Sequence, residues 1–459
     1  MTRASAATPD SIALFPLRPL STDTRPAALN VPPSAPVHAD GYAVRQVNPL
    51  EFAQWDAALA DCPSASFFHG AAWARVLHST YGFQPLYLVV ESGVRGRRFA
   101  PDALDIRGGM GLQTHDPKAH GSGDPCHAAA LPAQASNDPL GGRGSGTDEP
   151  RTQNAQPRTE TPPCGATPRF SALRPLMEVK SWLTGRRGIS LPFTDECAPL
   201  CPDAASFHLL HEAALACARA RRWRYLEYRG GRSWLGDVPA SKSFWGHRLD
   251  LRTGEKALFA KIDSAGQRAV RKAEQSGLTV EFSQSPEAIR VFYGLHCLTR
   301  KRLGVPPQPF VFFANIQRHI MAPNQGWIVL ARQGPVPVAG AVFFHSGKTV
   351  VFRFGASDRV FQHLRGNNLV MWTAIRQYAQ QGFEVLTFGR TALNNEGLRR
   401  FKLGWGTTEY PIEYLHYDVP AARWITATDF SSGWHTPVFR RLPIPISRLI
   451  GAVLYRHIA

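Results

Sequence analysis

The chain has 459 residues and a formal net charge of +17, from 52 lysines and arginines against 35 aspartates and glutamates. This length allows two or three domains with buried cores, and a hydrophobic content of 44% argues against a wholly disordered chain. The positive charge favours polyanionic partners: a phosphorylated sugar-lipid, coenzyme A, tRNA or an acidic membrane surface. A generally basic proteome would explain the same charge without such a partner.

The first 40 residues are rich in Pro, Ala, Ser and Thr, which predicts a disordered segment. They show no secretory pattern. Order is expected from about residue 41, with a helix over 49–60 and a strand over 85–91. From about 93 to 170 the chain is rich in Gly, Pro, Asp, Gln and Thr and has little apolar periodicity. A structureless loop of this length is uncommon inside a compact domain, so we predict a disordered insertion there.

Order is expected to resume at residue 176 and to run through two units with a similar order of elements. The predicted strands are 176–180, 190–193, 225–229, 245–251, 278–282, 327–332, 338–345, 349–356 and 384–388. The predicted helices are 206–221, 264–275, 286–302 and 369–381. Beyond them, residues 446–456 mix apolar residues with arginines at helical spacing. Such a helix can pack on the protein or lie on an anionic membrane leaflet.

The seven cysteines are dispersed, and no second pair or histidine cluster accompanies Cys197 and Cys201 to complete a zinc set. We therefore expect no metal site. An odd, dispersed count is typical of reduced thiols in the cytosol, so a cytoplasmic location is predicted. The chain has no apolar run of 18 residues, and no membrane-spanning helix is expected.

The densest group of chemically useful residues follows the strand predicted at 384–388. Gly389 permits a tight turn at the end of that strand. Next to the turn, four side chains place positive charge where an anionic substrate can bind. They are Arg390, Arg399, Arg400 and Lys402. The alternative interpretation is a strand, a turn and a short helix whose basic face is solvated.

Two other segments are candidates for binding phosphate. A glycine and small polar residues at the start of the helix predicted from 369 would leave backbone N–H groups for an anion, whereas the alternative is a helix capped by asparagine. These residues are Arg365, Gly366, Asn367 and Asn368. Arg268, Arg271 and Lys272 are spaced i, i+3, i+4 and share one helix face, which is either solvated or turned to an anion.

The segments 388–391 (FGRT), 395–397 (NEG) and 401–406 (FKLGWG) resemble the C-terminal signature of the FemAB-like branch of the GNAT acyltransferases. The resemblance covers roughly 42–92 and 171–418. Within that branch, the pattern resembles FemAB-like proteins that are associated with exopolysaccharide and PEP-CTERM gene clusters. These proteins carry a BioF2-like acetyltransferase domain. It implies an α+β fold of tandem GNAT-like domains, with mixed, mostly antiparallel sheets flanked by helices.

The domains expected from this resemblance follow the composition of the chain. They are a disordered segment at 1–40, a first GNAT-like domain at 41–250 interrupted at about 93–170, a second GNAT-like domain with the active site at 251–418, and a basic tail helix at 419–459.

The resemblance also implies roles for individual residues. Phe401 and Lys402 match a Phe–Lys pair at the active site, where the lysine stabilises negative charge on the attacked carbonyl oxygen. Arg390 would bind a phosphate, and Trp405 would line the pocket. His69 and Trp73 match a motif of the first domain, so His69 is a candidate for lining the acceptor site; the alternative is a satisfied interior histidine.

Two of the basic segments have counterparts in the same families. The turn at 365–368 corresponds to the one that holds the coenzyme A pyrophosphate in acetyltransferases, although it keeps only one glycine of the usual string. The helix with Arg268 resembles an R-x-x-R-K-A helix that faces phosphate in relatives.

The implied enzyme is an acyl- or aminoacyltransferase that forms an amide on an amino group of a cell-wall or surface-polysaccharide precursor. The amine would attack an ester or thioester directly, and Glu413, Glu396 and Asp358 are available as bases. Acyl-coenzyme A or aminoacyl-tRNA would be the co-substrate, with no tightly bound cofactor. The expected partners are a lipid-linked or nucleotide-linked sugar or peptide precursor, tRNA, and the inner face of the plasma membrane by peripheral contact. The alternatives are acyl-coenzyme A-dependent N-acetylation of an amino sugar and a non-catalytic lipid-linked-sugar binding protein.

Overall fold

The computed structural model describes residues 37–39, 42–60, 62, 64–91, 170–426 and 436–458. The predicted disordered segment therefore lies outside the described residues, except for a short strand at 37–39. The predicted insertion also lies outside them, except for residue 170.

The N-terminal part begins with a small antiparallel sheet in the order β1-β2-β4-β5. Its strands are β1 (Val37–Ala39), β2 (Tyr42–Val47), β4 (Tyr87–Glu91) and β5 (Ala172–Arg174). Between β2 and β4 lie η1 (Pro49–Glu51), α1 (Trp55–Ala58), η2 (Phe67–His69), α2 (Ala71–Tyr81) and β3 (Gln84–Pro85). The helix predicted over 49–60 is thus two short pieces. The strand predicted at 85–91 is confirmed in β3 and β4.

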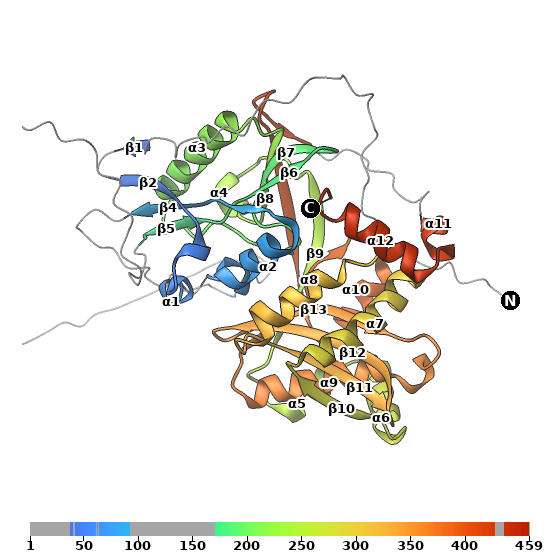
Figure 1. Cartoon of the computed structure of the whole chain (residues 1–459). Helices are drawn as coiled ribbons and strands as arrows, with labels where there is room; N and C mark the ends of the chain where they lie inside the picture. Colours follow the sequence, from blue (N-terminus) through green and yellow to red (C-terminus); the bar gives the residue numbers. More distant parts are fainter. Residues whose placement is uncertain are drawn as a thin grey trace, which may run out of the picture. The chain divides into compact units, whose positions relative to one another are not determined.

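The remaining strands of the described chain form one 13-stranded sheet (Figure 1). Eleven of them lie in the order β10-β11-β12-β13-β14-β9-β16-β8-β7-β6-β3, and two further short strands pair alongside this row. Two similar units lie in it. The first is the hairpin of β6 (Met177–Ser181) and β7 (Gly185–Ile189), then α3 (Ala204–Ala220) and β8 (Tyr225–Arg229) parallel to β7. The second is β10 (Thr279–Ser283), β11 (Gly326–Gln333), β12 (Val336–Ser346) and β13 (Thr349–Ser357), then α9 (Gly366–Gln380) and β14 (Val385–Thr387) parallel to β13.

The two units exchange strands in the middle of the sheet. β9 (Lys242–Asp250) follows β8 in the chain but pairs with β14 of the second unit. β16 (Thr408–Asp418) follows the second unit but pairs with both β9 and β8. Parallel strands joined by a crossover helix, repeated twice within a mixed sheet, confirm the tandem GNAT-like α+β fold.

Helices cover both faces of the second unit, and successive side chains of its strands point alternately into two cores. On β11, Ile328 and Leu330 belong to a core shared with α7 (Pro286–Leu303), α8 (Phe310–Ile316) and α2. Val329 and Ala331 belong to a second core shared with α5 (Glu255–Lys261), α6 (Ser264–Gln275) and α9. This period of two fits a strand buried on both faces.

The remaining elements are short. They are α4 (Arg232–Leu235), a π-helical turn at Gln317–Met321, η4 (Gln362–Leu364), β15 (Thr391–Ala392), α10 (Glu396–Leu403), β17 (Arg423–Ile425), α11 (Thr436–Arg441) and α12 (Ile444–Leu454). Among the described residues, none of the helices combines the length and the apolar character needed to cross a bilayer.

The strand predicted at 190–193 is wrong. β7 ends at Ile189, and Leu191 and Phe193 have φ angles of 53° and 57°. A strand cannot continue through residues in the left-handed region, so the chain turns away from the sheet here. The strand that precedes this turn was missed because two arginines interrupt its apolar pattern.

Candidate active site

The parallel strands β13 and β14 pair only at residues 349–351 and 385–387. Further along, two arginines approach the same carboxylate. Arg353 of β13 places Nη1 3.8 Å from Oδ2 of Asp195, and Arg390, just after β14, places Nε 3.8 Å from Oδ1. Asp195 comes from the loop that follows β7. The site therefore combines residues of both units at the point where the two strands separate.

The loop at 190–196 carries Asp195 and is held by hydrogen bonds from four directions. The Trp73 indole donates to the Pro192 carbonyl over 3.1 Å, and Arg353 donates to the carbonyl of Phe193. Arg229 Nη1 donates to the Thr194 carbonyl over 3.1 Å, and the Tyr414 hydroxyl lies 2.9 Å from the Asp195 carbonyl oxygen. Left-handed residues such as Leu191 and Phe193 persist where the surroundings fix the backbone in this way.

Arg390 is oriented from several sides. Its Nη1 donates to the Tyr414 hydroxyl over 2.9 Å, and its guanidinium carbon lies 4.5 Å from the centre of the Phe244 ring. The side chain is 33% exposed, whereas that of Asp195 is 16% exposed. One end of Arg390 is therefore fixed while part of the guanidinium reaches solvent, where a substrate can meet it.

Positive charge exceeds negative charge around Asp195. The cations are Arg229, Lys242, Arg248, Arg353 and Arg390, and the carboxylates are Asp195, Glu196 and Glu227. Burial lowers the pKa of Arg353, and its buried Nε makes no hydrogen bond among the described residues. Incompletely compensated cations in a partly buried site favour an anionic ligand or a developing oxyanion.

The two glutamates of this cluster differ. Burial would raise the pKa of Glu227, but Arg229 at 2.5 Å and His416 at 2.8 Å outweigh it and hold that pKa well below its ordinary value. Burial raises the pKa of Glu196, since Arg248 lies further away at 3.7 Å. Glu227 is thus a fixed counter-charge, whereas Glu196 is a carboxylate suited to accept a proton nearer neutrality.

The turn before Arg390 requires its glycine. Gly389 has a φ of 67°, and a Cβ there would lie 2.6 Å from Oδ2 of Asp195. The ammonium of Lys402 donates to the carbonyls of Gly389 and Arg390, each over 2.9 Å, and the residue is only 3% exposed. Lys402 on α10 therefore holds the backbone that presents Arg390.

A model of the GNAT acetyltransferase domain matches residues 266–410, which include Arg353, Arg390 and Lys402. The solved structure of FemX has the same fold, with a TM-score of 0.53 and 13% identity over 81% of this chain and 96% of that chain. The chain therefore carries a GNAT acetyltransferase domain, and its fold is that of FemX.

Other comparisons give weaker likenesses. A tandem GNAT protein from the clavulanic acid biosynthesis pathway has a TM-score of 0.43 and 9% identity, covering 82% of this chain and 98% of that chain. L-PGS from Bacillus licheniformis has a TM-score of 0.39 and 13% identity, covering 62% and 86%. A search of curated protein sequences finds no match to the chain.

Within the GNAT domain, the predicted phosphate-binding turn forms the N-terminus of α9. Arg365 is exposed and has a φ of 60°, and it is the N-cap residue. No side chain caps the helix, so capping by asparagine is wrong; instead, Asn367 donates to the Ser357 hydroxyl over 3.0 Å, and Asn368 lies in the first turn. A Cβ on Gly366 would lie 3.1 Å from Val338, which shows how closely the helix start approaches β12. Backbone N–H groups at such a start suit an anion.

The other predicted residues lie on α6, at α10, and in the segment from η2 to α2. Arg268, Arg271 and Lys272 are exposed on α6, and Arg271 lies 5.5 Å from the centre of the Phe259 ring. Phe401 is half-buried and packs edge-on to the buried Trp405, with ring centres 6.2 Å apart. Whether these residues contact a substrate stays a prediction.

Trp73 supports the loop that carries Asp195, and His69 bonds to Ala198, just after that loop. His69 is buried, with Nδ1 2.9 Å from the Ser66 hydroxyl and Nε2 2.8 Å from the Ala198 carbonyl oxygen. Burial lowers its pKa. Trp73 is also buried and bonds to the loop itself. Both side chains contribute to the site through backbone carbonyls in or just after this loop.

Several residues of the site were missed by reasoning from the sequence. The missed residues are Asp195, Glu196, Arg229, Arg353 and Tyr414. The adjacent carboxylates in Pro-Phe-Thr-Asp-Glu, directly after a buried strand, are the signal that could have found two of them. The carboxylates named as bases are engaged elsewhere: Glu413 pairs with Arg232, Glu396 with Arg399, and Asp358 accepts from the Val360 N–H.

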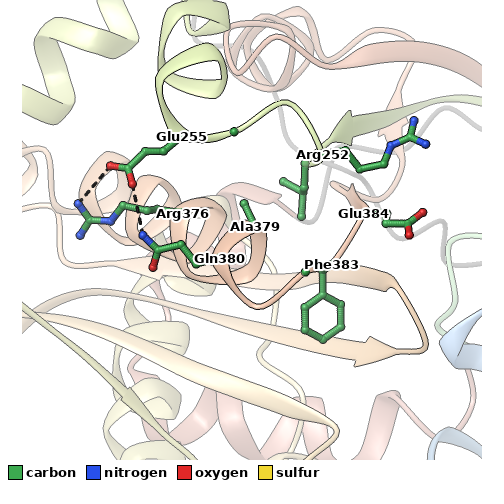
Figure 2. A pocket seen from close by; sticks show the side chains of 10 residues that line it. Arg252, Glu255, Arg376, Ala379, Gln380, Phe383 and Glu384 are labelled. Atoms are coloured by element: carbon green, nitrogen blue, oxygen red, sulfur yellow. Dashed lines mark hydrogen bonds and ion pairs between the residues drawn. The ribbon is translucent and has the colours of Figure 1, made fainter.

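A pocket of about 400 Å³ lies at the opposite end of α9 from Gly366. Figure 2 shows Arg376 and Gln380 turned toward Glu255: Arg376 lies 3.8 Å from Glu255, and Gln380 donates to Glu255 over 3.3 Å. Arg252 pairs with Asp250 over 2.9 Å. Since its cations are already paired, this pocket offers less to an anionic substrate than the cluster around Asp195 does.

Proposed function

We propose that the protein forms an amide on an amino group of a cell-wall or surface-polysaccharide precursor, with the reaction centred between Arg353, Asp195 and Arg390. The observation that carries this proposal is the partly exposed Arg390, fixed at the point where β13 and β14 separate within the GNAT domain. A fixed guanidinium there can stabilise the negative charge that develops on the attacked carbonyl oxygen.

The proposed reaction is a direct aminolysis. The acceptor nitrogen forms a bond to the carbonyl carbon of the donor, and the carbon–sulfur or carbon–oxygen bond to the leaving group breaks. Glu196 takes the proton that the amine loses, because burial raises its pKa toward the range of a useful base. The leaving thiolate or alkoxide takes up a proton in turn. Lys402 acts by positioning the turn that holds Arg390.

Acyl-coenzyme A is the first candidate donor. The GNAT domain match supports it, and so does the N-terminus of α9, which has no side-chain cap and suits a pyrophosphate. Aminoacyl-tRNA is the second candidate, supported by the net charge of +17 and by the resemblance to FemAB-like proteins. In both cases the donor would bind and be released in each turnover, and no cofactor would be tightly bound.

The proposed acceptor is lipid-linked or nucleotide-linked and carries phosphate. The exposed cations of α6 would bind that phosphate, and residues 251–418 would form the catalytic domain. A cytoplasmic location is proposed with it, because nucleotide-linked precursors and both donors are made there.

Calorimetric titration of the full chain with acetyl-coenzyme A and, separately, with charged tRNA tests the donor. We expect saturable binding of one donor, weakened at least about tenfold by Arg365→Ala, because a charge-assisted contact to phosphate contributes roughly 1.5–3 kcal/mol. The control Arg219→Ala, an exposed arginine at the end of α3, should bind as the wild type does. Binding of neither donor would contradict the proposal and favour a non-catalytic binding protein.

A further inference from the structure

The C-terminal helix α12 packs on the protein with its small residues. Ser447 and Gly451 face inward, and a Cβ on Gly451 would overlap the carbonyl oxygen of Pro307. One turn later Tyr455 is also buried; its hydroxyl donates to the Pro306 carbonyl over 3.1 Å and accepts from Arg300 over 2.5 Å. This inner face is held by close approach and by polar contacts.

Three large apolar side chains of α12 point the other way. Ile446, Leu449 and Val453 are 47%, 68% and 57% exposed, at spacings of three and four residues. They are three of the ten large hydrophobic side chains that are exposed in the described part of the chain, and all three lie on a helix of 11 residues. In an ordinary surface helix the apolar stripe faces the core. α12 carries apolar residues on both sides: Ile444, Ile450 and Leu454 are half-buried, and the three exposed side chains form a second stripe that faces away from the protein.

The charge of this region is of one sign. Residues 436–458 contain no aspartate or glutamate. Their four arginines are Arg440, Arg441, Arg448 and Arg456, and all four are exposed. An apolar stripe flanked only by cations is the pattern of a helix that lies in the interface of an anionic bilayer.

α12 lies beside α7 (Figure 1). A pocket of about 600 Å³ is lined by both helices, with Ile444 and Arg448 from α12. Leu298 and Val336 line it and are 39% and 42% exposed, so they extend the apolar surface beyond the helix. Arg290, Arg448 and Asp358 also line it; Arg290 pairs with Glu287 over 3.2 Å, and Arg448 lies 5.2 Å from the centre of the Tyr293 ring. The apolar walls suit the upper part of a lipid acyl chain, and Arg448 can meet its anionic headgroup.

We propose that the outer face of α12, together with this pocket, docks on an anionic lipid surface. A second copy of the chain fits less well, because a two-fold contact would set the arginines of one helix against those of the other. The inference is independent of the proposed chemistry, since none of these residues belongs to the cluster around Asp195.

Flotation of the full chain with vesicles tests the proposal, without any substrate present. We expect binding to vesicles of phosphatidylcholine and phosphatidylglycerol in equal parts, and little binding to phosphatidylcholine alone. Leu449→Ser with Val453→Ser should weaken binding at least about tenfold, since each CH₂ group that enters the bilayer contributes about fourfold. The matched control, Leu393→Ser with Leu403→Ser, removes two exposed leucines elsewhere and should bind as the wild type does.

Other results would overturn the proposal. They are no binding to the anionic vesicles, equal binding of the α12 double variant, binding without dependence on anionic lipid or salt, and a lipid-free dimer that the double variant dissociates. An Arg390→Ala variant should float with the vesicles like the wild type, so a failure of the catalytic proposal would leave this result unchanged.

Discussion

Arg390 illustrates how a single reactive side chain depends on its neighbours. Its guanidinium donates a hydrogen bond to the Tyr414 hydroxyl and packs on the Phe244 ring, and its Nε lies 3.8 Å from the Asp195 carboxylate. Tyr414 also lies 3.0 Å from the Thr194 carbonyl oxygen, so one hydroxyl fixes both the arginine and the loop with the carboxylate. The two charges therefore keep their relative position before any substrate arrives, which is the condition for electrostatic stabilisation of a transition state.

At the same scale, Glu196→Gln tests the proposed base. Because burial raises the pKa of Glu196, its deprotonated form should be lost at a higher pH than that of an ordinary glutamate. We expect kcat/KM of the wild type to fall as the pH drops below that raised pKa. Glu196→Gln should lower kcat by about 100-fold and remove this acidic limb. Glu212→Gln, an exposed control on α3, should retain it; an unchanged profile in Glu196→Gln would rule out this role.

At the scale of elements, the regular parts of the chain could be predicted and the irregular ones could not. The helices at 264–275 and 286–303 follow their apolar periodicity and have Asp263 and Ser285 as N-caps. The turn at Gly389 was also predictable, because glycine follows a short apolar run. The loop at 190–196 was not, since its left-handed residues are a leucine and a phenylalanine held by partners distant in sequence. Pairing of β9 with β14 is equally non-local.

The start of α9 gives a prediction for an element. Gly366→Ala would place a Cβ 3.1 Å from Val338 and 3.2 Å from Ala339, so these neighbours must give by a few tenths of an ångström. We expect a loss of roughly 1–3 kcal/mol in the free energy of unfolding and a higher KM for the donor. Gly294→Ala in α7 is a matched control, because a Cβ there meets nothing within 4 Å. That change should stabilise the protein by roughly 0.5–1 kcal/mol; similar unfolding midpoints for the two variants would contradict this account.

At the scale of the whole molecule, buried and half-buried histidines make stability depend on pH. Burial, with help from nearby cations, lowers the pKa of His211 and His247 to about 4 and that of His296 to about 3. As the pH falls below 6.5, these histidines become protonated in the unfolded chain but stay neutral in the folded protein. The contribution to stability is therefore complete above pH 6.5 and is lost as the pH falls toward 4.

Denaturant unfolding at a series of pH values checks this expectation. Each histidine adds about 1.4 kcal/mol per pH unit to the slope within its window. Paired carboxylates such as Glu227 act at lower pH, so the slope between pH 6.5 and 5 reports the histidines. His211→Gln with His296→Gln should flatten it, and the exposed His363→Gln should not. A free energy of unfolding that stays constant over this range would show that these imidazoles are accessible to protons.

The measurement that tests the central claim most directly is the rate of amide formation by the Arg390→Ala variant. A labelled acyl group is supplied on coenzyme A, or a labelled amino acid on tRNA, and the product is followed on a nucleotide-linked amino-sugar peptide. We predict transfer by the wild type and by Arg219→Ala, and a fall in kcat of about 100-fold in Arg390→Ala with an unchanged melting temperature. Transfer by Arg390→Ala at the wild-type rate, or no transfer by the wild type from either donor, would contradict the account.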